Sequence, residues 1–290
     1  PAVVAGVPRI IMCTPPRQDG TVDPHLLVAA LEAGVTEVYK LGGAQAVAAM
    51  AFGTETVPRV DKIVGPGNNY VTMAKQLVYG EVGLDSLAGP SEIIIVADET
   101  ACPRLVAADL LSQAEHGPVD EASAILLTPS ASLLAETARE VERQLVILPR
   151  KEIARACLEK NGGLVLTRDL AEAVDLANFA APEHLELMVA DPYYWLTKVR
   201  HAGAVFLGSF TPESVGDYVA GTNHVLPTGG TARFASALSV DDFVKKTSIV
   251  AYSNEGLAKF GPAAVALARV EGLEAHARAV EIRLEDKEGR

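Results

Sequence analysis

The chain has 290 residues, of which 49% are hydrophobic and 21% are charged. This composition excludes intrinsic disorder over most of the chain, and the length predicts two domains or one large domain with appendages. A net charge of −12 opposes binding to nucleic acid or to an anionic membrane surface.

The sequence also indicates the compartment, through its lack of targeting signals and through its cysteines. No apolar run approaches the roughly 18–20 residues of a membrane-spanning helix, and no basic segment leads into a cleavable apolar stretch. The three cysteines, Cys13, Cys102 and Cys157, follow no metal-binding spacing and are expected to be buried free thiols. These observations favour a cytoplasmic protein without a membrane partner.

Short apolar runs alternate with longer amphipathic segments up to about residue 210. Strands are expected at residues 9–12, 37–40, 62–64, 93–96, 124–127, 164–166, 185–189 and 204–207. Helices are expected at residues 24–31, 44–51, 69–78, 103–115, 130–144, 170–179 and 192–199. This alternation is typical of an α/β fold with mainly parallel sheets.

Three further segments organise the chain. The sequence AGPSE at residues 88–92 precedes a fresh strand and predicts a domain boundary. Residues 209–239 are dense in Gly, Thr, Ser and Pro, and a loop of this length is usually functional. An Ala-rich helical pattern occupies residues 255–283, and the final LEDKEGR is expected to be a solvated tail.

Two Gly-rich turns each follow a strand and open a helix. They are LGGAQ at residues 41–45 and GPGN at residues 65–68. Unpaired N–H groups at a helix start suit a phosphate or a nucleotide edge. Neither turn matches GxGxxG, so binding of a nucleotide and an ordinary turn both remain open.

The segment LLSQAEHG contains a possible metal-binding pair. Gln113 and His116 are three residues apart, which places them on one face of a helix, within reach of one ion. Imidazole suits zinc, whereas an amide oxygen is a rarer ligand. The alternative is that His116 only complements a helix C-terminus before Gly117 and Pro118.

The segment APEHLEL contains a possible acid–base pair. Pro182 fixes a turn, and Glu183 and His184 lead directly into a strand. A carboxylate beside an imidazole offers two general bases of different strength in one cleft. The alternative is a hydrated turn.

The remaining polar candidates are weaker. Asp217, Asn223 and His224 lie in the long loop, and Glu271 and His276 lie in the last helical pattern. His25 and His201 are interpreted as structural.

The ordered set of motifs is more specific than any single one. It comprises LGGAQAVAAMAFGTETVPRVDKIVGPGN, DSLAGPSEIIIVAD, LLSQAEHG, FAAPEHLEL, GDYVAGTNHVLPTGGTARFASALSV and EAHARAVEIR. Over essentially the whole chain this set resembles the histidinol dehydrogenase family. The resemblance implies a zinc-dependent enzyme that oxidises L-histidinol through L-histidinaldehyde to L-histidine, with two NAD as hydride acceptors.

The resemblance also implies roles for individual residues. It places the metal ligands at Gln113, His116, Asp217 and His276, and the catalytic pair at Glu183 and His184. His184 would be the base toward the alcohol, and Glu183 would activate water on the aldehyde. Zinc would mainly orient the substrate. The substrate-binding residues fall on Ser91, His184, His224 and Glu271, and the NAD contacts fall on Gln45 and Asn68.

The family's fold is similar to two incomplete Rossmann-like domains and a small helical tail that crosses to the other subunit of a homodimer. Here it implies a cofactor-side domain at residues 1–92, a second domain at residues 93–238 and the tail at residues 239–290. Family members have a further segment before the position of Pro1, and the chain begins without Met. From this difference we expect the 290-residue chain alone to be weakly active or inactive and to be prone to oligomerise beyond a dimer.

Two other functions fit the same residues. One is a related zinc- and NAD-dependent dehydrogenase of another amino alcohol or diol, since the metal and catalytic residues would serve any primary alcohol. The other is a metal- or nucleotide-binding module without turnover. His224 and Glu271 can both meet a charged imidazole-amine substrate, which favours histidinol.

Overall fold

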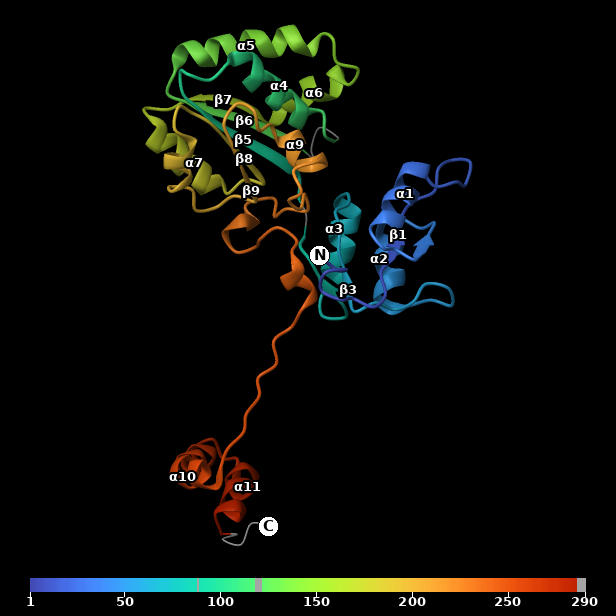
Figure 1. Ribbon diagram of the computed structural model, residues 1–290, viewed down its shortest axis with the longest axis vertical. Coiled ribbons are helices and arrows are strands. Elements are labelled where there is room, and N and C mark those ends of the chain that lie inside the picture. The colour runs from blue at the N-terminus through green and yellow to red at the C-terminus, as the bar shows by residue number, and fades with distance from the viewer. Residues whose placement is uncertain (88, 118–121, 286–290) are drawn as a thin grey trace. The chain divides into compact units, whose positions relative to one another are not determined.

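The computed structural model describes residues 1–87, 89–117 and 122–285. Ala88, at the start of the expected boundary motif, Pro118 and the last five residues of the tail therefore lie outside the described residues. The chain divides into two compact units, Pro1–Val244 and Lys245–Arg290 (Figure 1). The second unit begins near the expected start of the tail at residue 239, and the boundary near residue 92 stays a prediction.

The first part of the larger unit contains two small parallel sheets. One pairs β1 (Ile11–Cys13) with β2 (Glu37–Tyr39), and the other pairs β3 (Lys62–Ile63) with β4 (Gly83–Leu84). Three helices accompany them: α1 (Pro24–Glu32), α2 (Gly43–Phe52) and α3 (Asn69–Leu77). Strand β4 was not expected, because two residues that include a glycine leave no apolar run to recognise.

A five-stranded parallel sheet forms the centre of the larger unit. Its strands are β5 (Ser91–Ala97), β6 (Ala122–Thr128), β7 (Gly162–Leu166), β8 (His184–Met188) and β9 (Ala204–Leu207), in the order β7-β6-β5-β8-β9. All four pairings are parallel. The predicted α/β class and all eight expected strands are confirmed, with bounds that differ by a few residues.

Helices cover both faces of this sheet (Figure 1). One face carries α4 (Pro103–Ala114), α5 (Ala131–Leu145) and α6 (Lys151–Asn161), packed on a core that includes Ile93 and Ile95. The other face carries α7 (Leu170–Ala180) and α8 (Pro192–Leu196), packed on Ile94 and Val96. The alternation of these four side chains along β5 follows from the pleat of a strand. Helix α6 was missed because only Ala154 and Cys157 of it are buried.

The expected long loop contains a helix, which corrects that interpretation. Helix α9 (Glu213–Tyr218) is followed by two short 3-10 turns, η1 (Thr231–Arg233) and η2 (Val240–Phe243). A Cβ at Gly216 would lie 2.6 Å from Cε1 of Phe206, so only glycine lets α9 approach β9 this closely. A six-residue helix with a central glycine has no apolar stripe, and its stability comes from packing.

The second unit is a helix pair. The expected single helical stretch is two helices, α10 (Asn254–Val270) and α11 (Glu274–Glu285). The break falls at Gly272, whose φ of +76° favours glycine. Arg269 bridges the turn through ion pairs with Glu274 and Glu281, at 3.1 Å and 2.9 Å.

A buried ion pair fixes the GPGN turn. The Lys75 Nζ donates to Asp85 Oδ1 at 2.6 Å, to the Gly65 carbonyl at 2.7 Å and to the Ser86 carbonyl at 3.1 Å. The Asp85 Oδ2 accepts the Gly65 N–H at 2.7 Å. Both side chains are at most 3% exposed. The pair therefore ties both the N–H and the carbonyl of Gly65 to the segment that leads into β5.

The cysteines are all free, as expected. Only Cys157 is buried, whereas Cys13 is half-buried and Cys102 is exposed at the start of α4. The expectation of three buried thiols was therefore wrong for Cys102. Among the described residues, every helix is too short or too polar to cross a membrane.

Candidate active site

A pocket of about 330 Å³ lies where β5 and β8 begin. Seven of the predicted site residues line it: Asn68, Ser91, His116, Glu183, His184, Asp217 and His224. Doubly wound sheets ordinarily bind ligands beyond the carboxyl ends of their strands. This pocket instead uses the amino ends, because Ser91 is the first residue of β5 and His184 is the first of β8.

Glu183 is a buried carboxyl held by β5. Its Oε2 accepts the Ser91 hydroxyl at 2.6 Å and the Glu92 N–H at 3.1 Å. Burial raises the pKa of Glu183 to about 7, although these two hydrogen bonds oppose the shift. The side chain is thus poised to exchange a proton near neutral pH, which suits a general base.

His184 is a neutral imidazole of defined tautomer. Its Nδ1 lies 3.2 Å from the carbonyl oxygen of Glu92, which can only accept. Nδ1 therefore carries the proton, and Nε2 keeps its lone pair. Burial lowers the pKa of His184 to about 4, so the ring is an uncharged base at neutral pH. Nδ1 lies 3.7 Å from Oε2 of Glu183, which places the two bases side by side.

Three side chains beside this pair could hold a metal ion. Ligand atoms of His116, Glu213 and Asp217 lie within 4.8 Å of one another. Gln113 belongs to the same neighbourhood, since its Nε2 donates to the Ser91 hydroxyl at 3.0 Å. That bond leaves its Oε1 buried and without a hydrogen-bond partner. An imidazole, carboxylates and an unpartnered amide oxygen form a donor set that fits zinc or a similar divalent cation.

Buried carboxyls continue behind the metal group. Oε1 of Glu186, on β8, accepts the N–H of Glu213 at 2.8 Å and so holds the first turn of α9. Burial raises the pKa of Glu213 to about 8 and that of Asp109 to about 6, and it raises the pKa of Glu186 well above its usual range. These three buried carboxyl groups lie close to one another, and their ionised forms are costly in the interior. A bound cation would neutralise that negative charge.

The structure does not bring every predicted residue to this pocket. Gln45 lies in the first turn of α2 and does not line it. Glu271 and His276 belong to the second unit. Asn223 instead closes its own turn, with Oδ1 accepting the Val225 N–H at 2.9 Å. Asn68 lines the pocket and also caps α3 through the N–H groups of residues 70 and 71.

The Gly-rich turns have structural reasons of their own. A Cβ at Gly42 would lie 2.8 Å from Pro15, and Gly43 has a φ of +70°. A Cβ at Gly67 would lie 2.5 Å from Val71. Glycine is therefore required in both turns whether or not a ligand binds there.

The buried Glu183 carboxyl should make the stability of the larger unit depend on pH. Its folded pKa of about 7 exceeds the unfolded value, so the side chain does not oppose folding at low pH. It opposes folding increasingly as the pH rises from about 4.5 to about 7, by about 3 kcal/mol in all, and the penalty levels off above pH 7. Glu183→Gln should therefore match the original protein at pH 4.5 and be more stable by about that amount at pH 8.

Urea denaturation in metal-free buffer, followed by the fluorescence of Trp195, checks this difference. Trp195 is the only tryptophan and packs on the central sheet. A stability gain that is the same at both pH values would contradict the assigned pKa.

Comparison with known proteins decides the family. A model of the family described as histidinol dehydrogenase matches residues 1–284. The chain belongs to the histidinol dehydrogenase family. Members of this family oxidise histidinol in histidine biosynthesis. The resemblance drawn from the ordered motifs is thus confirmed.

Relatives of known sequence and structure agree. The histidinol dehydrogenase of Geobacillus kaustophilus (strain HTA426) is 59% identical over 288 residues, which cover 99% of this chain and 68% of the relative. That of Moorella thermoacetica is 59% identical over 285 residues, covering 98% and 67%. The crystal structure of histidinol dehydrogenase from Elizabethkingia anophelis matches with a TM-score of 0.91 and 45% identity, covering 99% of this chain and 66% of that one. The chain therefore spans about two thirds of the length of these family members.

Sequence reasoning missed Glu213 and the backbone of Glu92. Glu213 precedes Asp217 by four residues, a helical spacing that was visible in ESVGD. It was overlooked because the segment was interpreted as a loop. The contribution of Glu92 comes from its N–H and carbonyl groups, and sequence patterns carry no signal for those.

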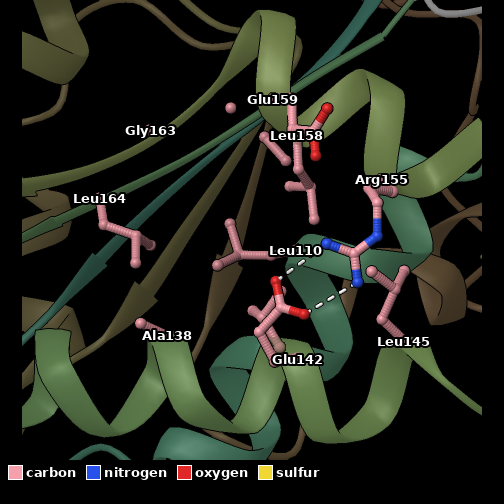
Figure 2. A pocket seen from close by; sticks show the side chains of 12 residues that line it. Leu110, Ala138, Glu142, Leu145, Arg155, Leu158, Glu159, Gly163 and Leu164 are labelled. Atoms are coloured by element: carbon pink, nitrogen blue, oxygen red, sulfur yellow. Dashed lines mark hydrogen bonds and ion pairs between the residues drawn. The ribbon is translucent and has the colours of Figure 1, made fainter.

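A second cavity, of about 300 Å³, lies among α5, α6 and the sheet (Figure 2). Leu110, Leu158 and Leu164 line it, and an ion pair between Arg155 and Glu142 at 2.8 Å closes one side. None of the predicted site residues contributes to it. Its two carboxyl groups, those of Glu142 and Glu159, are exposed, and Glu142 is paired with Arg155. We therefore assign the chemistry to the first pocket, where the bases are buried.

Proposed function

We propose that this chain oxidises L-histidinol to L-histidine through L-histidinaldehyde, with two NAD as acceptors. The observation that carries the proposal is the pairing of a neutral His184 with a Glu183 carboxyl whose pKa is about 7, beside a group that could hold a metal. A two-step oxidation needs one base for an alcohol and one for water. Two adjacent bases in one pocket meet that need.

We propose that each subunit of a homodimer binds one zinc ion. Its ligands are Gln113, His116 and Asp217 of one subunit and His276 of the partner subunit. The buried, unpartnered Oε1 of Gln113 supports this assignment, because a cation would satisfy it. When bound, zinc supplies a Lewis-acid anchor for the amino and imidazole nitrogens of the substrate.

His184 serves the first oxidation. Its Nδ1–H is fixed by the Glu92 carbonyl, so Nε2 accepts the proton of the substrate hydroxyl while hydride leaves carbon for the nicotinamide. The low pKa of the ring keeps Nε2 unprotonated before the reaction.

Glu183 serves the second oxidation. Its Oε2 is anchored by the Ser91 hydroxyl and the Glu92 N–H, which leaves the other carboxylate oxygen to accept a proton from water. The water adds to the aldehyde, and the resulting hydrate loses the second hydride.

Binding residues complete the proposal. Ser91 and His224 line the pocket, and with His184 and Glu271 they would contact the substrate. Asn68 would contact NAD from the pocket wall, and Gln45 would do so from α2. The polar side chains of His224 and Glu271 favour a substrate that carries an imidazole and an amine.

Initial rates of NADH formation test this function. With Zn²⁺ present, L-histidinol should be oxidised with a kcat/KM at least about 10²-fold above that of an amino alcohol without the imidazole, because unpaired polar groups in the site penalise the analogue. Equal rates for both alcohols would indicate a dehydrogenase of broader scope. NADH binding and metal binding without turnover would indicate a module that does not catalyse the reaction.

A further inference from the structure

Glu213 carries a buried carboxyl group that the proposed mechanism does not use. We propose that it is a reserve metal ligand, which coordinates the ion within one subunit whenever His276 of the partner subunit is away from the site. The inference rests on the proposed zinc site and adds a ligand outside the set that the motifs imply. With Glu213 as a ligand, each subunit could bind its metal before the helix of the partner subunit reaches the site.

The positions of the ligand atoms support direct coordination. Zinc holds carboxylate and imidazole ligands at about 2.0–2.2 Å in tetrahedral geometry, so two ligands of one ion lie roughly 3.3–3.6 Å apart. The atoms of His116, Glu213 and Asp217 already lie within 4.8 Å of one another. Side-chain rotations that shift these atoms by up to about an ångström would bring all three onto one ion.

The hydrogen bonding of Glu213 is incomplete in a way that a cation would complete. Glu213 is 2% exposed, and its Oε1 has no hydrogen-bond partner. Gln113 Oε1, in the same neighbourhood, and Glu186 Oε2, directly behind Glu213, share this condition. Buried oxygens without partners are costly, and a divalent ion at this point would satisfy those it touches.

Helix α9 holds Glu213 where it can act. Glu213 and Asp217 are four residues apart on α9, so they lie on one face of the helix. The Glu186 carboxylate accepts the Glu213 N–H at 2.8 Å, and Gly216 seats the helix against the Phe206 ring. This double attachment fixes the helix backbone at Glu213 and leaves only its side-chain rotamers to adjust.

The placement of His276 explains why a reserve ligand would be useful. His276 lies on α11 of the second unit, whose helix pair follows a segment without regular structure at residues 244–253. The larger unit supplies Gln113, His116 and Asp217, which is one ligand short of the four that zinc ordinarily takes. Among the described residues, Glu213 joins His116 and Asp217 in one group, so its carboxyl can fill the fourth position.

Titration with Co²⁺ of the full chain tests the proposal by absorbance and by metal stoichiometry. Four proteins form a double-mutant cycle: the original, Glu213→Gln, His276→Ala and the double variant. Glu213→Met, which cannot coordinate through oxygen, repeats the Glu213 arm. Glu115→Gln removes the same charge next to His116 without belonging to the group and is the matched control. Circular dichroism confirms that each variant is folded.

We expect Glu213→Gln to change the Co²⁺ affinity less than about 3-fold in the original background and to lower it by roughly 10–100-fold in the His276→Ala background. The His276→Ala protein should retain one Co²⁺ per chain. Equal losses in both backgrounds would overturn the proposal and make Glu213 a positioning residue for Asp217. Complete loss of Co²⁺ from His276→Ala would overturn it as well. Failure of the original protein to bind Co²⁺ would instead contradict the zinc site of the proposed function.

Discussion

Replacing His184 by alanine should slow the oxidation of L-histidinol by roughly 10²–10⁴-fold, the range of general-base catalysis. The oxidation of supplied L-histidinaldehyde should be slowed much less, because in that step Glu183 is the base and it takes the proton from water. His184→Ala removes the only imidazole whose Nδ1 is fixed by the Glu92 carbonyl among the described residues. The two rates are measured separately as NADH formation from each substrate.

Glu183→Gln should show the opposite pattern. The amide can still accept the Ser91 hydroxyl and the Glu92 N–H, which hold Glu183 at 2.6 Å and 3.1 Å. The pocket should therefore keep its shape while losing the base for the aldehyde step. Oxidation of the aldehyde should fall by roughly 10²–10⁴-fold and should lose its rise with pH near 7. Equal losses in both assays for both variants would contradict the division of roles.

Replacing Lys75 by methionine should lower the free energy of unfolding by roughly 3–5 kcal/mol, because it leaves the Asp85 carboxylate buried and unpaired. Lys75 is 2% exposed and donates to three oxygens of the GPGN turn and its neighbours. Loss of these bonds should also loosen Asn68, so NADH affinity should fall together with stability. Urea denaturation followed by circular dichroism measures the first effect, and NADH fluorescence measures the second.

Two further variants serve as controls for Lys75. Lys75→Met combined with Asp85→Asn removes both charges and keeps an acceptor for the Gly65 N–H, so most of the stability should return. Arg155→Met breaks an ion pair of similar length, 2.8 Å, whose side chains are 42% and 62% exposed. It should cost no more than about 1 kcal/mol. A similar cost for Arg155→Met and Lys75→Met would show that burial does not decide the strength of these pairs.

The fold was largely predictable because its strands are apolar runs of the expected length. Ile93 to Val96 alternate between two helix-covered faces of the sheet, and a strand buried on both sides reads as a continuous apolar run. The failures were short elements that depend on tertiary contacts. Helix α9 exists because Gly216 fits against Phe206 and because Glu186 holds its first N–H, and neither contact can be seen in the local sequence.

The candidate site was predictable from the ordered motifs and much less so from single residues. Gln113 and His116, considered alone, fitted a helix C-terminus better than a metal site. The structure brings His116, Asp217, Glu183 and His184 into one pocket from segments that are far apart in the chain. The pKa shifts of the pair could not be predicted, because burial causes them and burial is a property of the folded chain. The proposed role of His276 stays a prediction.

The number of NADH molecules formed for each L-histidinol consumed tests the central claim most directly. A pocket that contains both bases should carry each molecule through both oxidations, so the account predicts two NADH and one L-histidine for each L-histidinol. Complete conversion in the presence of Zn²⁺ and excess NAD, with the product identified by chromatography, gives this ratio. A ratio of one, with L-histidinaldehyde accumulating, would contradict the pairing of Glu183 and His184 as the two bases of a two-step oxidation.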